Sequence, residues 1–368
     1  MSQTIYTATP RKAREWAMDA MLAGLTPFIK GSPGIGKSAI MRSIAKEWNL
    51  ELLDHRLSTS APEDLSGLPD FERNGVGPTT ATFRPFDLFP IEGTPLPKGK
   101  DGWLIFLDEL NSAPKEVQAA AYKLILDRQV GQHNLHGNVM LAAAGNLITD
   151  KAIVTNLGTA MQSRLVHIVM EANFEEWWED VALAQNYDFR VKGYLAWKKM
   201  KALMNFDPNH EEESFPCPRT WEFMHRMLDG KTFKEVTEND PHNPGKTRVR
   251  HEMDGKIGLF SGTIGQGEAV SFVQYCKVTH DLITIKEIVK DPTGAKVPKS
   301  AEMMWGQMIH VIEHVDDKNF ADVCTYISRY DLTFRVLFFR SIVAKMPELK
   351  SHPAFIRSSI ELAKYLYD

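Results

Sequence analysis

The stretch FIKGSPGIGKSAI, residues 28 to 40, constrains the fold of this chain more than any other part of it. It fits the spacing G-x-x-x-x-G-K-[ST] through Gly31, Gly36, Lys37 and Ser38. Glycines permit backbone angles at which successive N–H groups can surround a phosphate, and the start of a following helix adds a favourable dipole. The pattern therefore predicts a short strand, a phosphate-binding loop and a helix in direct succession.

The residue types in this loop also predict what it binds. The ammonium group of Lys37 would reach the β- and γ-phosphates of a nucleotide, and the hydroxyl group of Ser38 would ligate Mg²⁺. The absence of an N-K-x-D motif favours adenine over guanine. We expect ATP to contact nine successive residues: Gly31, Ser32, Pro33, Gly34, Ile35, Gly36, Lys37, Ser38 and Ala39.

A second stretch, GWLIFLDELN at 102–111, supplies the groups that hydrolysis needs. Its unbroken apolar run predicts a parallel strand that is buried on both faces and ends in Asp108 and Glu109. Carboxylates at the C-terminal end of such a strand face the ligand crevice. Asp108 is therefore predicted to hold the Mg²⁺ shell, and Glu109 to polarise the attacking water.

Two further stretches continue the pattern. GNVMLAAAGN (137–146) predicts a buried strand that ends in Asn146, which would orient the water or touch the γ-phosphate. MQSRLVHIVM (161–170) carries Arg164 just before an apolar strand, where an arginine can stabilise charge on the phosphoryl oxygens, often from a neighbouring subunit. Taken singly, Asn146 is typical of a strand-end cap and Arg164 of a surface arginine. The two preceding motifs favour the functional interpretation.

The order GSPGIGKS, LIFLDE, AAAGN, SRL and CPRTWEF resembles that of the AAA+ ATPases, specifically the MoxR-like branch. This resemblance implies an α/β fold: a three-layered αβα P-loop domain with a parallel sheet, then an α-helical lid and a C-terminal helical segment. It assigns Asn146 as sensor 1, Arg164 as the arginine finger and Arg219 as the sensor 2 arginine. It also implies a ring of copies, usually a hexamer, that holds ATP and Mg²⁺ between subunits.

The same resemblance divides the chain into three parts. The AAA+ domain would cover 1–172, the lid 173–279 and the C-terminal helical segment 280–368. Helical apolar spacing in the last segment predicts core packing between helices, although docking of a partner is the alternative. Within the lid, residues 237–258 are predicted to form an exposed loop.

Two expected features lie inside the AAA+ domain. An insertion over 60–99 holds seven of the twenty prolines, which excludes a long regular helix and favours a hairpin with Asn74–Gly75 as its turn. A second hairpin, over 127–138, would precede sensor 1. Its His133 and His136 are predicted to be exposed turn residues rather than metal ligands.

Composition limits the class of protein. A net charge of −4 argues against a nucleic-acid backbone as the main partner. The cysteines Cys217, Cys276 and Cys324 lack metal-ligand spacing and are predicted to be reduced thiols. The first residues lack the apolar core of a signal peptide and no run approaches membrane-spanning length, so we expect no membrane partner. The expected location is the cytoplasm of a bacterium, or of the host if a phage encodes the chain.

These features together favour a ring-forming ATP hydrolase that remodels a protein partner, a chaperone role. By resemblance, that partner is a protein with a von Willebrand factor A domain. Two alternatives stay open. A nucleic-acid-remodelling motor or helicase loader would need a basic pore lining, and 60–99 contains few lysines or arginines. A non-catalytic, nucleotide-gated scaffold would not need the hydrolytic residues.

Overall fold

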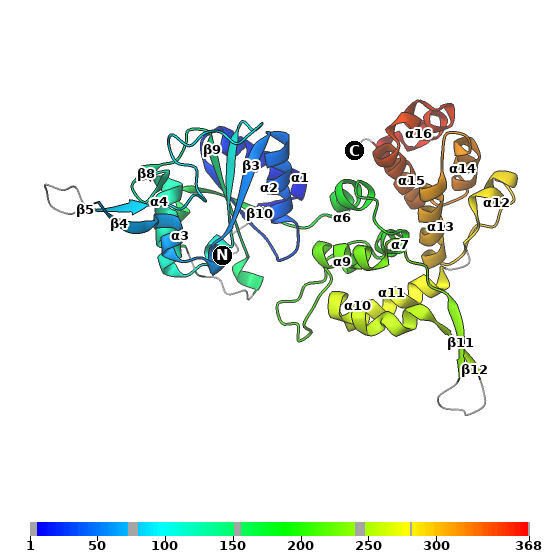
Figure 1. The fold of residues 1–368 in the computed structure, drawn as a ribbon. Coiled ribbons are helices and arrows are strands. Elements are labelled where there is room, and N and C mark those ends of the chain that lie inside the picture. Colours follow the sequence, from blue (N-terminus) through cyan, green and yellow to red (C-terminus); the bar gives the residue numbers. More distant parts are fainter. Residues whose placement is uncertain are drawn as a thin grey trace, which may run out of the picture. The chain divides into compact units, whose positions relative to one another are not determined.

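The computed structural model describes residues 6–72, 80–150, 155, 157–239, 247–279 and 282–366. The chain divides into two compact units, Met1–Ala172 and Asn173–Asp368 (Figure 1). The first is built around a parallel sheet, and the second consists of helices and a β-hairpin.

The first unit contains, among the described residues, a six-stranded sheet in the order β1-β10-β2-β9-β6-β3. Every neighbouring pair in it is parallel. Its strands are β1 (Thr7–Ala8), β2 (Thr26–Lys30), β3 (Leu50–Arg56), β6 (Gly102–Asp108), β9 (Val139–Gly145) and β10 (Leu165–Met170). The strand β6 is buried along its whole length, as expected for an apolar strand covered on both faces. This confirms the strands predicted around the sequence motifs.

Helices cover both faces of this sheet (Figure 1). The helix α4 packs its apolar side on alternate residues of β6 and β9, among them Ile105 and Ala143. The helices α1 and α2 contact the sheet on its other side, where residues such as Leu104 point. The helical segments of this unit are α1 (Pro10–Leu22), α2 (Lys37–Glu47), η1 (Leu57–Thr59), α3 (Pro62–Ser66), η2 (Leu110–Ser112), α4 (Lys115–Leu126), η3 (Ile148–Asp150) and α5 (Thr159–Gln162).

The insertion over 60–99 contains the short helix α3 and an antiparallel pair, β4 (Leu68–Glu72) and β5 (Thr80–Arg84). This confirms that the insertion forms a hairpin and no long helix among its described residues. The expected turn at Asn74–Gly75 lies outside the described residues. The second expected hairpin is also present, as β7 (Gln129–Val130) and β8 (His133–Asn134).

The two histidines of this second hairpin serve local structure. His133 is exposed, and its ring lies 3.1 Å from the carbonyl oxygen of Phe83. The Nδ1 of His136 accepts a hydrogen bond from the backbone N–H of Asn138 at 3.0 Å. Within the described ranges, no group of three or more His, Cys, Asp or Glu side chains could hold a metal ion.

The second unit is mainly helical. Its first helix is capped by Asn173, whose Oδ1 accepts a hydrogen bond from Glu176 N at 2.9 Å. Its elements are α6 (Phe174–Trp177), the π-helix η4 (Trp178–Leu183), α7 (Phe189–Lys198), α8 (Met200–Leu203), α9 (Pro218–Leu228), β11 (Glu235–Asn239), β12 (Thr247–His251), η5 (Glu252–Lys256), α10 (Ile257–Ile264), α11 (Gln266–Val278), α12 (Ile285–Lys290), α13 (Ala301–His314), α14 (Phe320–Ile327), α15 (Leu332–Lys345), η6 (Pro347–Ser351) and α16 (Pro353–Leu366).

A single hydrophobic core joins residues 173–279 to residues 280–368. The side chains of Trp221 and Phe272 belong to it, together with Ile309 and Phe338 from the later helices. All three cysteines are free and buried in this unit. Among the described residues, no helix is both long and apolar enough to cross a membrane.

The prediction of an exposed loop over 237–258 is wrong for the residues described there. The strands β11 and β12 pair in antiparallel register, and η5 follows. His251 and Met253 are buried. The strands of this hairpin carry charged residues, so the sequence does not indicate them as strands. These side chains pair across the hairpin, as Arg250 Nε and Glu238 Oε2 do at 3.3 Å.

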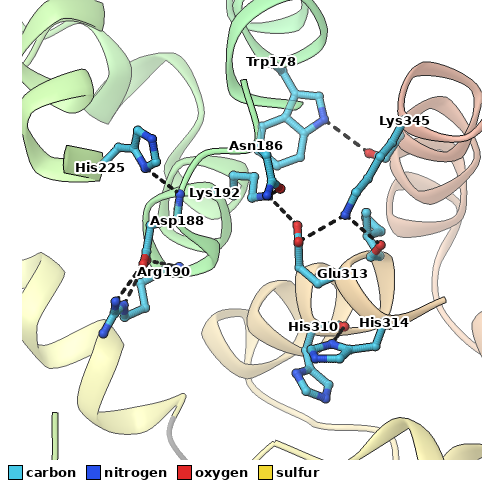
Figure 2. A network of polar contacts seen from close by, with 12 residues as sticks. Trp178, Asn186, Asp188, Arg190, Lys192, His225, His310, Glu313, His314 and Lys345 are labelled. Carbon is cyan, nitrogen blue, oxygen red and sulfur yellow. Dashed lines mark hydrogen bonds and ion pairs between the residues drawn. The ribbon is translucent and has the colours of Figure 1, made fainter. Parts of the chain in front are cut away.

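Figure 2 shows a buried polar network that ties three helices of this unit together. Lys192 of α7, whose side chain is 1% exposed, donates hydrogen bonds to Asn186 and to Glu313 of α13. Glu313 also pairs with Lys345 of α15 at 3.1 Å. Burial would raise the pKa of Glu313, but the charges of Lys192 and Lys345 outweigh it and lower that pKa.

Candidate functional site

The phosphate-binding sequence forms the predicted loop between β2 and α2, at the C-terminal edge of the sheet. Gly34 and Gly36 have φ angles of 78° and 101°, in the left-handed region that favours glycine. A Cβ atom on Gly31 would lie 2.7 Å from the carbonyl oxygen of Met170, so only glycine fits there. The path of the loop thus depends directly on its glycines.

Lys37 connects this loop to the end of a neighbouring strand. Its side chain is buried, and its Nζ donates hydrogen bonds to the carbonyl oxygens of Gly31 at 2.6 Å and Ser32 at 3.0 Å. A third bond goes to Asn146 Oδ1, just beyond β9, at 3.3 Å. The structure therefore brings Lys37 and Asn146 together from positions far apart in the sequence.

Ser38, at the start of α2, and Asp108, at the end of β6, are also in contact. Ser38 Oγ donates a hydrogen bond to Asp108 Oδ2 at 3.2 Å. The pair offers a hydroxyl and a carboxylate oxygen, and oxygen ligands are those that Mg²⁺ prefers, with water completing its shell. These two residues fit the predicted magnesium site. The nearby Lys37 ammonium fits the phosphates that such an ion accompanies.

Glu109 has an unusual backbone and a fixed side chain. It is a non-glycine residue with φ of 57°, a conformation that costs energy and clusters at active sites. Ser58 Oγ donates a hydrogen bond to Glu109 Oε2, and Arg56 Nε lies 3.6 Å from Oε1. Arg56 ends β3, which pairs with β6 so that Arg56 lies beside Asp108, and Ser58 lies in η1, directly after β3. The carboxylate is thus held beside the Ser38–Asp108 pair.

Sequence reasoning missed Ser58 and Arg56. Their only signal is position, at the C-terminal end of a strand that adjoins β6. It also missed Asn111, a buried residue that holds the end of β9. Asn111 Nδ2 donates to Asn146 O at 2.8 Å, and Asn146 N donates to Asn111 Oδ1 at 3.1 Å. A Cβ atom on Gly145 would lie 2.1 Å from that oxygen, so glycine is required for this approach.

A further residue missed from sequence is Asp150 in η3. It is buried in the turn that follows Asn146. Burial raises the pKa of Asp150 above its ordinary value, and the opposing influence of the Ser32 hydroxyl and the Lys37 charge does not cancel this rise. The candidate site thus contains an acid that no sequence motif indicates.

The two predicted arginines have contacts with other residues than those of this cluster. Arg164 is exposed between α5 and β10, donates to Ala160 O at 2.7 Å and has its guanidinium 5.3 Å from the ring of Tyr122. Arg219 is exposed in the first turn of α9, in the second unit. Their catalytic roles stay predictions, as do those of the other site residues.

Comparison with known proteins assigns the stretch that carries most of these residues. Residues 27–182 match the AAA domain, dynein-related subfamily. The chain is also similar to the crystal structure, at 2.00 Å resolution, of a "putative ATPase" from Cytophaga hutchinsonii. That similarity has a TM-score of 0.33 and 13% sequence identity, over 97% of this chain and 81% of the other. No curated protein matches the chain.

The matched stretch begins in β2 and ends in η4, so it contains the loop, the three motif strands and Arg164. The match to an AAA domain thus falls mainly on the parallel α/β sheet of the first unit, and a helical region follows it. An AAA domain binds a nucleotide, usually with Mg²⁺, and the oxygen and ammonium groups described above suit both.

Proposed function

We propose that this chain is a Mg²⁺-dependent ATP hydrolase of the MoxR-like branch of AAA+ proteins. The observation that carries the proposal is the convergence of Lys37, the Ser38–Asp108 pair, Glu109 and Asn146 at one edge of the sheet. These groups match the three requirements of phosphoryl transfer to water, which are phosphate binding, metal binding and orientation of the nucleophile.

Each of these residues has a definite task in the proposed reaction. Lys37 exchanges its bonds to the Gly31 and Ser32 carbonyls for bonds to phosphate oxygens. Ser38 and Asp108 would hold a magnesium ion, which would supply positive charge to neutralise those oxygens. Glu109, fixed by Ser58, accepts a hydrogen bond from the attacking water and orients it for in-line attack.

We further propose that the chain acts as a ring of copies, with six as the expected number. Arg164 is exposed, so its guanidinium is accessible to the nucleotide of an adjoining copy. Arg219 would report the nucleotide state to the helices of the second unit. The coupled motion would remodel a protein partner in the cytoplasm, one with a von Willebrand factor A domain.

A phosphate-release assay with Mg²⁺-ATP tests the hydrolytic part. Lys37→Ala is expected to abolish release, whereas Lys46→Ala, which changes an exposed lysine on the same helix, is the matched control and should leave it intact. Equal activity of the two variants would contradict the proposal. Strong stimulation of release by DNA or RNA would replace the protein partner with a nucleic acid.

A further inference from the structure

A cavity of about 740 Å³ lies beside the ends of β2, β9 and β10, and the proposed hydrolysis gives it no task. Side chains of β2 and β10 form part of its wall. Phe28 is in register with His167, and Lys30 with Val169, and all four residues line the cavity. Because neighbours in register project from the same face of a sheet, these side chains point to one side of it.

This side is the face of the sheet on which α4 packs. Phe28 is also in register with Ala143 of β9, and both belong to the hydrophobic core that α4 covers. The P-loop helix α2, with Lys37 and Ser38 at its start, contacts the sheet on the other face. The cavity is therefore separate from the proposed phosphate and magnesium positions.

Lys30 is the only lysine or arginine among the described residues that line the cavity. Its side chain is half-buried, and its Nζ lies 6.0 Å from the centre of the Phe28 ring. Within the part of the chain that the structure describes, this ammonium group forms no ion pair and no hydrogen bond. Burial lowers the pKa of Lys30, because the ammonium group loses water and gains no opposite charge in return. An anion in the cavity would supply that charge.

The rest of the described lining limits what kind of anion fits. Apolar side chains such as Leu157 and Val169 alternate with polar ones such as Thr149 and Thr155. The lining also contains one acid, the exposed Glu171, which would repel a ligand with several negative charges. A single carboxylate on an apolar body suits one ammonium group and these walls. The volume is within the range of small-molecule sites.

We propose that this cavity binds a small organic acid, with the single carboxylate on the Lys30 ammonium group and the apolar body against Phe28 and Leu157. The inference goes beyond the proposed function, because binding at this place needs no nucleotide and no hydrolysis. The bound acid would also contact Asn111 and Asn146, which line the cavity and hold each other at the end of β9.

The test compares two probes of the same shape, benzoate and the uncharged benzamide, by NMR titration of the full-length chain. We expect benzoate to bind about tenfold more tightly, because its carboxylate accepts a charge-assisted hydrogen bond from Lys30. Lys30→Met keeps the unbranched stem but removes the charge, so its Kd for benzoate should rise to that for benzamide. The matched control is Lys46→Met, which changes an exposed lysine of α2 and should keep the preference.

Further variants separate charge from structure and this cavity from the P-loop. Lys30→Gln should lose the preference as Lys30→Met does, so the inference stays testable if one of them folds poorly by thermal unfolding. Lys30→Arg keeps a positive charge and should retain the preference. Lys37→Ala should bind benzoate as the wild type does, whatever its effect on nucleotide.

Two results would overturn the inference and leave the proposed function untouched. One is equal affinity of the wild type for benzoate and benzamide. The other is a preference for benzoate that survives in both uncharged variants of Lys30. Loss of phosphate release in every assay, with benzoate binding intact, would instead contradict the proposed function alone.

Discussion

At the scale of single residues, Glu109 links backbone conformation to chemistry. Its left-handed φ of 57° directs the chain away from β6 directly after Asp108, and Ser58 and Arg56 then fix the carboxylate. An ordinary extended residue would continue the strand instead. The strain is maintained by the hydrogen bonds and the buried strand around it.

Glu109→Gln should leave ATP binding unchanged and lower the rate of hydrolysis by about 10²- to 10⁴-fold, the usual contribution of a general base. An amide keeps the shape of the side chain but cannot take up the proton of the attacking water. Equilibrium binding and single-turnover phosphate release measure the two effects. A normal rate in this variant would show that another group activates the water.

Asn111→Ala should reduce the free energy of unfolding by about 1–3 kcal/mol, because it removes two hydrogen bonds and leaves the backbone groups of Asn146 without their partner. We also expect slower hydrolysis with little change in ATP affinity, since Asn146 loses its support while the P-loop is intact. Chemical denaturation and steady-state kinetics test both. Loss of affinity with an unchanged kcat would contradict this role for Asn111.

Several residues of the candidate site could be predicted from sequence, and others could not. Lys37, Asp108 and Asn146 follow glycine-rich or apolar stretches whose spacing has a physical cause, so the sequence indicates them. Ser58 and Asp150 follow no such pattern. They reach the site only because β3 pairs with β6 and because the chain turns back after β9, which are tertiary facts.

At the scale of elements, the same distinction holds. The strands β6 and β9 were predictable because long apolar runs must be buried in a parallel sheet. The helix α9 was predictable from Pro218, which suits the first helical turn. The hairpin β11–β12 was not, because its strands carry charged residues and its stability comes from cross-strand pairs.

The network in Figure 2 gives a prediction for the helices α7, α13 and α15. Glu313→Gln should lower the free energy of unfolding at neutral pH by about 3–5 kcal/mol, because it leaves the buried charge of Lys192 uncompensated. Denaturant unfolding followed by circular dichroism measures this. The control is Glu302→Gln, which changes a half-buried acid in the first turn of the same helix, outside this network.

The same residue predicts how stability depends on pH. The folded-state pKa of Glu313 is below its ordinary value of 4.5, so its contribution is complete above that value and is lost as the pH falls through the folded-state pKa. The wild type should therefore lose stability below about pH 4.5 more steeply than Glu313→Gln. Parallel acid profiles of the two chains would refute this.

At the scale of the whole molecule, the proposed ring makes activity a property of pairs of copies. Lys37→Ala and Arg164→Ala should each be inactive alone, since one lacks phosphate binding and the other the charge supplied to a neighbour. In an equal mixture, about one quarter of the interfaces join an intact loop to an intact arginine, so about that share of wild-type activity should return. A mixture as inactive as its components would place Arg164 outside the neighbour's site.

The common core of residues 173–279 and 280–368 has a consequence for how such a protein can be shortened. Trp178 donates a hydrogen bond to Ser341 at 3.3 Å, so the two ends of the unit are bonded to each other deep inside it. A chain that ends after residue 279 would expose apolar side chains of this core to water and would aggregate. A natural protein that dispenses with the last helices must therefore have refilled this interior with other side chains.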